Sequence, residues 1–233
     1  GLSSEQLLAL GRTDPDNHEE TFCMTVLGLK MARARNAVSH LHSRVSAGMW
    51  KSIWPSKRLE EIPIGYITNG VHVGTWLSTE MDRLYSRWLG DGWQTRMYDP
   101  AVWEPVEQID DEELWELNNI LLERLLDFVR HRVREQYQAR GEEDPTGDGK
   151  KPYLSDSALT IGFARRFAPY KRADLLLRDL DRLDKLVNNP ERPVQVIFAG
   201  KAHPADDNGK QLIQRIFQIT RDPRFAGKIV FVE

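Results

Sequence analysis

The sequence contains one cysteine, Cys23, among 233 residues, so a disulfide within the chain is excluded. This composition fits a reducing compartment, and we therefore expect a cytoplasmic protein. Cys23 itself lies in an apolar helical pattern with Phe22, Val26 and Leu27. That setting favours a packed thiol over a nucleophile.

Long apolar runs are absent as well. No run approaches the roughly 20 residues that a membrane-spanning helix needs. The segment from Gly1 to Glu5 has neither the basic nor the apolar region of a secretory signal. Hydrophobic residues make up 40% of the chain and charged residues 29%, as in soluble globular proteins. We expect no membrane partner.

The sequence also lacks a positive charge excess spread along its whole length. The net charge is −3, but it is unevenly distributed: residues 158–233 hold 14 Lys and Arg against 9 Asp and Glu, a net of +5, whereas residues 1–157 hold 18 against 26, a net of −8. A nucleic-acid-binding protein more often carries a wide basic face with stacking aromatic side chains. The local excess instead favours a small anionic ligand, and we expect no nucleic-acid partner.

Helical patterns dominate residues 1–157. Asp110 and the three acidic residues after it mark the start of the longest helix. Residues 141–157 are polar and rich in turn formers, which predicts an exposed loop. The elements expected in this part are helices over residues 4–10, 18–54, 78–89 and 110–139 and a strand over residues 62–67.

Residues 158–233 alternate between strand and helix patterns. The expected strands cover residues 158–163, 194–199 and 228–232, and the expected helices cover residues 171–187 and 207–220. This alternation predicts an α/β fold with a parallel sheet and right-handed crossovers. Because the sequence stops at the end of a strand, without helices to finish the sheet, we expect a truncated domain.

The most informative segment is the basic run from Arg165 to Arg172, which places four fixed positive charges in eight residues directly after the first of these strands. Ligands of open α/β sheets bind at the carboxyl ends of the strands, where helix N-termini add partial positive charge. Arg166 and Lys171 are therefore candidates to close on one phosphate, the first with a planar fork of donors and the second with a movable point charge. A solvated basic loop is the alternative.

Two further segments carry polar residues that could contribute to a ligand site. Lys201 and His203 follow the second strand of the parallel sheet, so they should lie at the same edge as Arg166 and Lys171. Asn69 precedes a glycine in a turn signal, where a backbone can approach a ligand closely. No metal site is expected, because histidines two residues apart on a helix do not face the same way.

Four segments, in the right order, resemble the glycogen and α-glucan phosphorylases. Asn36 to Ser43 is similar to the family's Asn-Gly-Val…Ile-His-Ser pattern, Thr68 to Leu77 to its Thr-Asn-Gly-Ile…Trp-Leu, Arg165 to Arg172 to its Lys-Arg-Ile-His-Glu-Tyr-Lys-Arg, and Ala199 to Pro204 to its Gly-Gly-Lys-Ala-Ala-Pro.

The resemblance implies a retaining glucosyl-transfer enzyme with the two Rossmann-like domains of the GT-B fold and a pyridoxal phosphate cofactor. Its partners would be α-1,4-glucan, phosphate and glucose 1-phosphate. Residues 1–157 would then be the mostly helical end of the N-terminal catalytic domain and an interdomain segment, and residues 158–233 the beginning of the C-terminal domain. The resemblance implies the following roles: Arg166 and Lys171 hold the reacting phosphate, Asn69, Tyr170 and Lys201 contact substrate, and Arg165 faces the cofactor's phosphate.

Some residues depart from the family pattern. Arg165 stands where the family has lysine, Ala168 where the mammalian-type pattern has histidine, and Arg33 where that pattern has a sugar-contacting histidine. The lysine that would bind the cofactor covalently has no counterpart in these 233 residues. We therefore expect the isolated chain neither to bind the cofactor covalently nor to turn over glucan.

Two other functions remain open. Nucleotide-sugar-dependent glucan synthases share the two-domain plan and also use an arginine and a lysine for the donor phosphates, although Asn69 with its glycine and the segment from Gly200 to Pro204 favour a phosphorylase. The other alternative is a non-catalytic module, in which replacing Lys171 would leave phosphate affinity unchanged.

Overall fold

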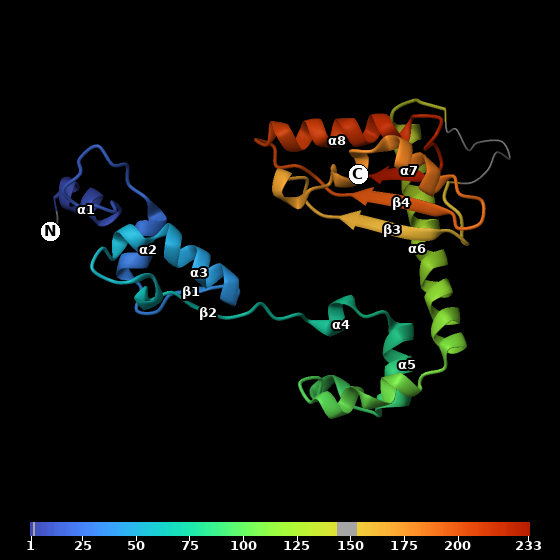
Figure 1. The fold of residues 1–233 in the computed structure, drawn as a ribbon, viewed down its shortest axis with the longest axis horizontal. Coiled ribbons are helices and arrows are strands. Elements are labelled where there is room, and N and C mark those ends of the chain that lie inside the picture. The colour runs from blue at the N-terminus through green and yellow to red at the C-terminus, as the bar shows by residue number, and fades with distance from the viewer. Residues whose placement is uncertain (2, 144–152) are drawn as a thin grey trace. The chain divides into compact units, whose positions relative to one another are not determined.

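The structure is a computed structural model that describes residues 1, 3–143 and 153–233. The chain forms two compact units, Gly1–Ser78 and Thr79–Glu233 (Figure 1). The expected domain boundary after residue 157 falls inside the second unit and stays a prediction. Within the described residues, each helix is either too short or too polar to cross a bilayer.

The first unit is built from short helices around one pair of short parallel strands. Asn36 pairs with Gly65 and Ala37 with Tyr66. Its elements are α1 (Ser4–Leu10), α2 (Met24–Met31), β1 (Asn36–Ala37), α3 (His40–Met49), the 3-10 turns Lys51–Ile53 and Leu59–Glu61, β2 (Gly65–Tyr66) and α4 (Val73–Trp76).

The single helix expected over residues 18–54 is wrong, whereas α1 confirms the expected helix over 4–10. The long pattern contains two helices and a strand, because Ala32 leaves the helical conformation and residues 36–37 join the parallel pair. Ser39 then caps α3, its hydroxyl accepting from the backbone N–H of His42 at 3.1 Å. The expected strand over 62–67 shrinks to two residues, Gly65 and Tyr66.

The second unit is a three-stranded parallel sheet between helical layers. The strand order is β3-β4-β5, with Phe163 paired to Phe198 and Phe198 to Phe231. Its elements are α5 (Thr79–Leu89), the 3-10 turns Trp93–Thr95 and Pro100–Gln108, α6 (Asp111–Ala139), β3 (Leu159–Ala164), the 3-10 turns Pro169–Lys171 and Leu175–Leu177, α7 (Leu180–Val187), β4 (Val194–Ala199), α8 (Asp207–Thr220) and β5 (Ile229–Val232). The predicted parallel α/β sheet is thus confirmed.

Alternate residues of β4 and β5 face two separate cores. On one face, Phe198 and Phe231 pack with α7 and α8 through side chains such as Leu183 and Ile216. On the other face, Ile197 and Val230 pack with α6. Figure 1 shows α7 and α8 together on one side of the strands. Since both faces of these two strands are covered, β5 reads as a continuous apolar run and β4 as an apolar run interrupted at Gln195, as buried parallel strands do.

The helix expected over residues 171–187 is wrong in its first half. Two 3-10 turns replace it, and α7 starts at Leu180. Arg172 has a φ of 57°, in the left-handed region, which stops any helix begun at Pro169. Asp179 then caps α7, its carboxylate accepting from the backbone N–H of Arg182 at 2.9 Å.

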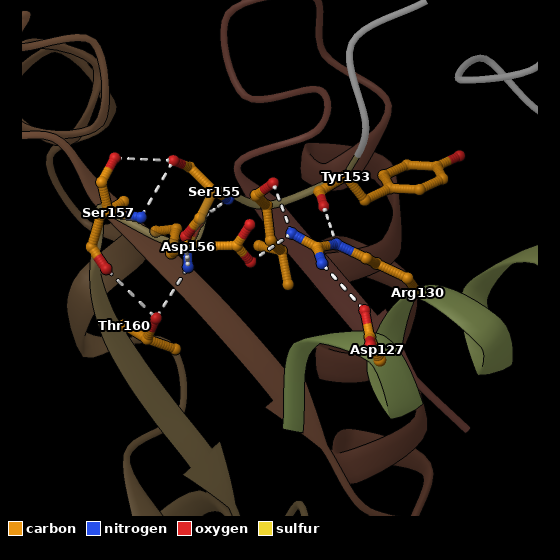
Figure 2. Close-up of polar contacts among 10 residues, drawn as sticks. Asp127, Arg130, Tyr153, Ser155, Asp156, Ser157 and Thr160 are labelled. Atoms are coloured by element: carbon orange, nitrogen blue, oxygen red, sulfur yellow. Dashed lines mark hydrogen bonds and ion pairs between the residues drawn. The ribbon is translucent and has the colours of Figure 1, made fainter. Parts of the chain in front are cut away.

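A polar network holds the chain where it enters β3 (Figure 2). The side chain of Arg130, on α6, is 12% exposed and donates to the carbonyl of Tyr153 at 3.0 Å and to Asp156 at 2.8 Å. Gln195 on β4, 2% exposed, accepts from the Ser155 N–H at 2.6 Å and donates to the Ser155 carbonyl at 2.9 Å. This network fixes the segment between α6 and the sheet.

The loop expected over residues 141–157 is described only at its ends, because residues 144–152 lie outside the described residues. At its start, Glu142 forms an ion pair with Arg221. At its far end, Tyr153 and Leu154 are buried against α6 and β5 and are not exposed as expected. Their apolar side chains complete the second core.

One ion pair between α5 and α6 makes stability depend on pH. Arg124 donates to Glu80 at 2.6 Å, and this hydrogen bond, with the Glu80 backbone N–H, lowers the pKa of Glu80 from 4.5 to about 2. The folded state therefore binds its proton less readily than the unfolded state. The stabilisation is present above pH ~4.5 and is lost as the pH falls towards ~2.

We expect Glu80→Gln to flatten the dependence of the urea unfolding midpoint on pH between about pH 5 and pH 2. Glu116→Gln is the matched control, because Glu116 is exposed on α6 without an ion pair to any described residue. Equal slopes for the wild type and Glu80→Gln would contradict the assignment.

Candidate functional site

The carboxyl ends of β3 and β4 lie side by side, since Ala164 pairs with Ala199. The loops that follow these strands are joined by a hydrogen bond from the N–H of Phe167 to the carbonyl of Lys201, at 3.1 Å. The expectation that the two loops share one edge of the sheet is therefore confirmed. Arg165, Arg166 and Lys201 are carried on this edge.

Phe167 anchors the first loop. Its side chain is 1% exposed, and its ring lies 5.6 Å from Phe163 and 5.7 Å from Phe231, measured between centroids. The two preceding residues, Arg165 and Arg166, remain exposed. Burial of one aromatic side chain thus fixes the backbone while its cationic neighbours face solvent.

The cations of this edge have no acidic partners among the residues that the structure describes. Within the described ranges, the side chains of Arg165, Arg166, Lys171 and Lys201 form no ion pair. The ammonium of Lys171 lies 4.6 Å above the ring centroid of Tyr170, a cation–π contact that leaves its charge uncompensated. An edge with several such cations attracts anions.

The second loop is shaped by its own polar side chains. Asp206 caps α8, its carboxylate accepting from the Gly209 N–H at 2.9 Å. His203 accepts from the Ala205 N–H at 3.1 Å and thus stabilises the turn. Asp207 forms an ion pair with Lys210 at 3.0 Å. Only Lys201 adds positive charge from this loop.

Asn69 lies in the first unit, in the exposed segment between β2 and α4. The following stay predictions: the roles of Asn69, Tyr170, Lys201 and Arg165, and the convergence of Arg166 with Lys171.

Cys23 is half-buried at the start of α2, where the backbone N–H groups of Val26 and Thr25 lower the pKa of its thiol.

Sequence reasoning missed three residues that shape this edge: Phe167, Gly200 and Gly209. Gly200 stands directly after β4, with a φ of 142°. A glycine at the end of a strand signals a close backbone approach, and this signal was present in the sequence. Phe167 gave a weaker signal in the sequence, because the presence of one aromatic residue within a basic run does not reveal that its side chain is buried.

Three known proteins that are similar to this chain are phosphorylases. No protein-family model matches the chain. Over 233 residues it is 43% identical to a glycogen phosphorylase of Aquifex aeolicus and 42% identical to a maltodextrin phosphorylase of Thermococcus litoralis. Along its whole length, the chain is similar to the phosphorylases. A glycogen phosphorylase of Mycobacterium tuberculosis is 38% identical over 232 residues.

These matches cover 100% of the chain but only 33%, 27% and 26% of the three phosphorylases, in the same order. The resemblance predicted from four segments is thus confirmed over the chain as a whole. The chain spans a third or less of the length of the phosphorylases that it matches.

Proposed function

We propose that this chain is part of an α-glucan phosphorylase, which cleaves α-1,4-glucan with orthophosphate to give glucose 1-phosphate. The observation that carries the proposal is the match of the entire chain to proteins named glycogen and maltodextrin phosphorylase. The uncompensated cations at the edge of β3 and β4 support it, because orthophosphate is a small dianion.

In this proposal Arg166 and Lys171 hold the phosphate that attacks the glycosidic bond. An arginine fork orients the phosphate through paired hydrogen bonds, and a lysine adds a charge that adjusts to its position. Tyr170, in the loop after β3, and Lys201, in the loop after β4, would contact substrate. Asn69 would bind a hydroxyl of the glucosyl unit. Fixed cations stabilise charge that develops on the phosphate during transfer.

The residues present also suit pyridoxal phosphate in one respect. The exposed guanidinium of Arg165, without an acidic partner among the described residues, is a suitable donor for the cofactor's phosphate. When bound, the cofactor would supply a phosphate that donates a proton beside the substrate. No lysine of this chain is assigned to hold it covalently.

The proposal extends to the fold and the location of the whole protein. The parallel sheet would be the start of the C-terminal Rossmann-like domain of a GT-B enzyme, preceded by the helical end of the catalytic N-terminal domain. A cytoplasmic location is proposed because Cys23 is the single cysteine, which fits a reducing compartment.

The test is an assay of the protein that contains this chain, given glucan and orthophosphate without any nucleotide. We expect glucose 1-phosphate to form, as measured by a coupled phosphoglucomutase assay. The 233-residue chain alone is expected to give none. A requirement for a nucleotide sugar would overturn the proposal in favour of a glucan synthase.

A further inference from the structure

We propose that Gly200 and Gly209 are positioning residues that fix the backbone of the loop carrying Arg165 and Arg166, and thereby set the affinity of the site for phosphate. This inference rests on the proposed function. Neither glycine touches the reacting atoms, so each would act through the loop packed against it.

Gly200 allows a close approach between the two loops. A Cβ atom at this position would lie 2.2 Å from the carbonyl oxygen of Arg165 and 3.3 Å from the ring of Phe167. Backbone atoms cannot swing away as the tip of a side chain can. The φ of 142° independently disfavours any L side chain at Gly200.

Gly209 packs against the same loop from the first turn of α8. A Cβ atom there would lie 2.2 Å from the carbonyl oxygen of Phe167 and 3.0 Å from Asp206 Oδ2. Gly209 is also buried, although glycine is a poor residue inside a helix. The close approach explains why the helix has glycine at this position.

The two contacts fall on consecutive parts of one short segment. Gly200 lies against the carbonyl of Arg165, Gly209 lies against the carbonyl of Phe167, and the residue between them is Arg166. The hydrogen bond from the Phe167 N–H to Lys201 adds a third restraint. The backbone that presents Arg166 is therefore held at two points, one on each side of Arg166 in the sequence, by contacts that leave no room for a methyl group.

Four alanine variants separate the positioning role of Gly200 and Gly209 from the general effects of replacing a glycine. Gly200→Ala combines backbone strain with a collision, and Gly209→Ala introduces a collision alone. Gly227→Ala introduces strain alone, because Gly227 has a φ of 78° and open space around it, and Gly162→Ala introduces neither. All four residues lie in the second unit.

The first readout is phosphorolysis by the protein that contains this chain. We expect Gly200→Ala and Gly209→Ala to raise the KM for phosphate by about 10- to 100-fold, because an ångström of displacement is costly at a binding site. The KM for glucan should remain within about twofold, and the two control variants should leave both constants unchanged. Thermal unfolding measured in parallel shows whether a variant is merely unstable.

The second readout does not depend on the enzyme's activity. Hydrogen exchange followed by mass spectrometry should show faster exchange in residues 165–168 for Gly200→Ala and Gly209→Ala, and unchanged exchange for the two controls. A wild-type protein without phosphorolysis activity would contradict the proposed function, but the hydrogen-exchange measurement could still be interpreted. Exchange or a phosphate KM equal to that of the controls would overturn the inference.

Discussion

Replacing Arg166 with alanine is expected to lower kcat/KM for phosphorolysis by about 10²- to 10³-fold, the loss typical when a fixed donor to a developing anion is removed. The guanidinium is exposed and has no acidic partner within the described ranges, so its whole charge is available to an anion. Its backbone is fixed by the buried neighbour Phe167. The effect should appear when phosphate is the varied substrate.

Arg192→Ala is the matched control, because Arg192 is exposed and precedes β4, so it lies at the amino end of the strand, opposite the candidate site. It should leave phosphorolysis unchanged. Arg166→Lys should fall between the wild type and Arg166→Ala, since it keeps the charge and loses the fork. Similar losses in Arg166→Ala and Arg192→Ala would show that total charge matters and that position 166 does not.

A double-mutant cycle tests whether Arg166 and Lys171 hold one phosphate. If they do, the combined variant should lose much less than the product of the two single losses, because neighbouring groups acting on one ligand are not independent. Independent effects would mean that the two side chains serve different ligands. That result would remove the physical basis of the proposed site.

Phe167→Ala is expected to lower the free energy of unfolding of the second unit by about 3–5 kcal/mol, the range for a buried phenylalanine replaced by alanine. The side chain is 1% exposed and contacts Phe163 and Phe231 in the core under α7 and α8, to which Phe198 also belongs. Its removal leaves a cavity that these side chains cannot easily fill.

Phe128→Ala is the control for this variant, because Phe128 belongs to the same unit and is 57% exposed on α6. It should cost less than about 1 kcal/mol. Urea unfolding of the chain, followed by circular dichroism, measures both. A loss for Phe167→Ala no greater than for Phe128→Ala would show that the loop is not anchored by this residue.

The elements that the sequence predicted well are those whose signals are local. The start of α6 follows from Asp110, whose carboxylate accepts from the Glu112 N–H at 2.8 Å, and β4 and β5 follow from their short apolar segments. In each case a few neighbouring residues carry the whole signal.

The errors arose where distant residues decide the structure. The strand at residues 36–37 depends on a partner at residues 65–66, which no local pattern reveals. The turns before α7 depend on Arg172 in the left-handed conformation and on the burial of Ala173 and Leu177. Both segments carry apolar residues at helical spacings, so tertiary contacts overrode the pattern.

The candidate site divides in the same way. The basic run and its place after β3 could be predicted, because charge and strand order are written in the chain. The close packing of Gly200 and Gly209 on the loop could not, because it depends on how two loops separated by more than thirty residues meet.

The free side of β3 has a practical consequence for anyone who expresses this chain alone. Among the described residues β3 pairs only with β4, and its Leu159 and Ile161 are 64% and 42% exposed. An open strand with apolar side chains is a template for another copy. Concentrated solutions should therefore associate through this strand, and lysine at position 159 or 161 would be the first change to make for solubility.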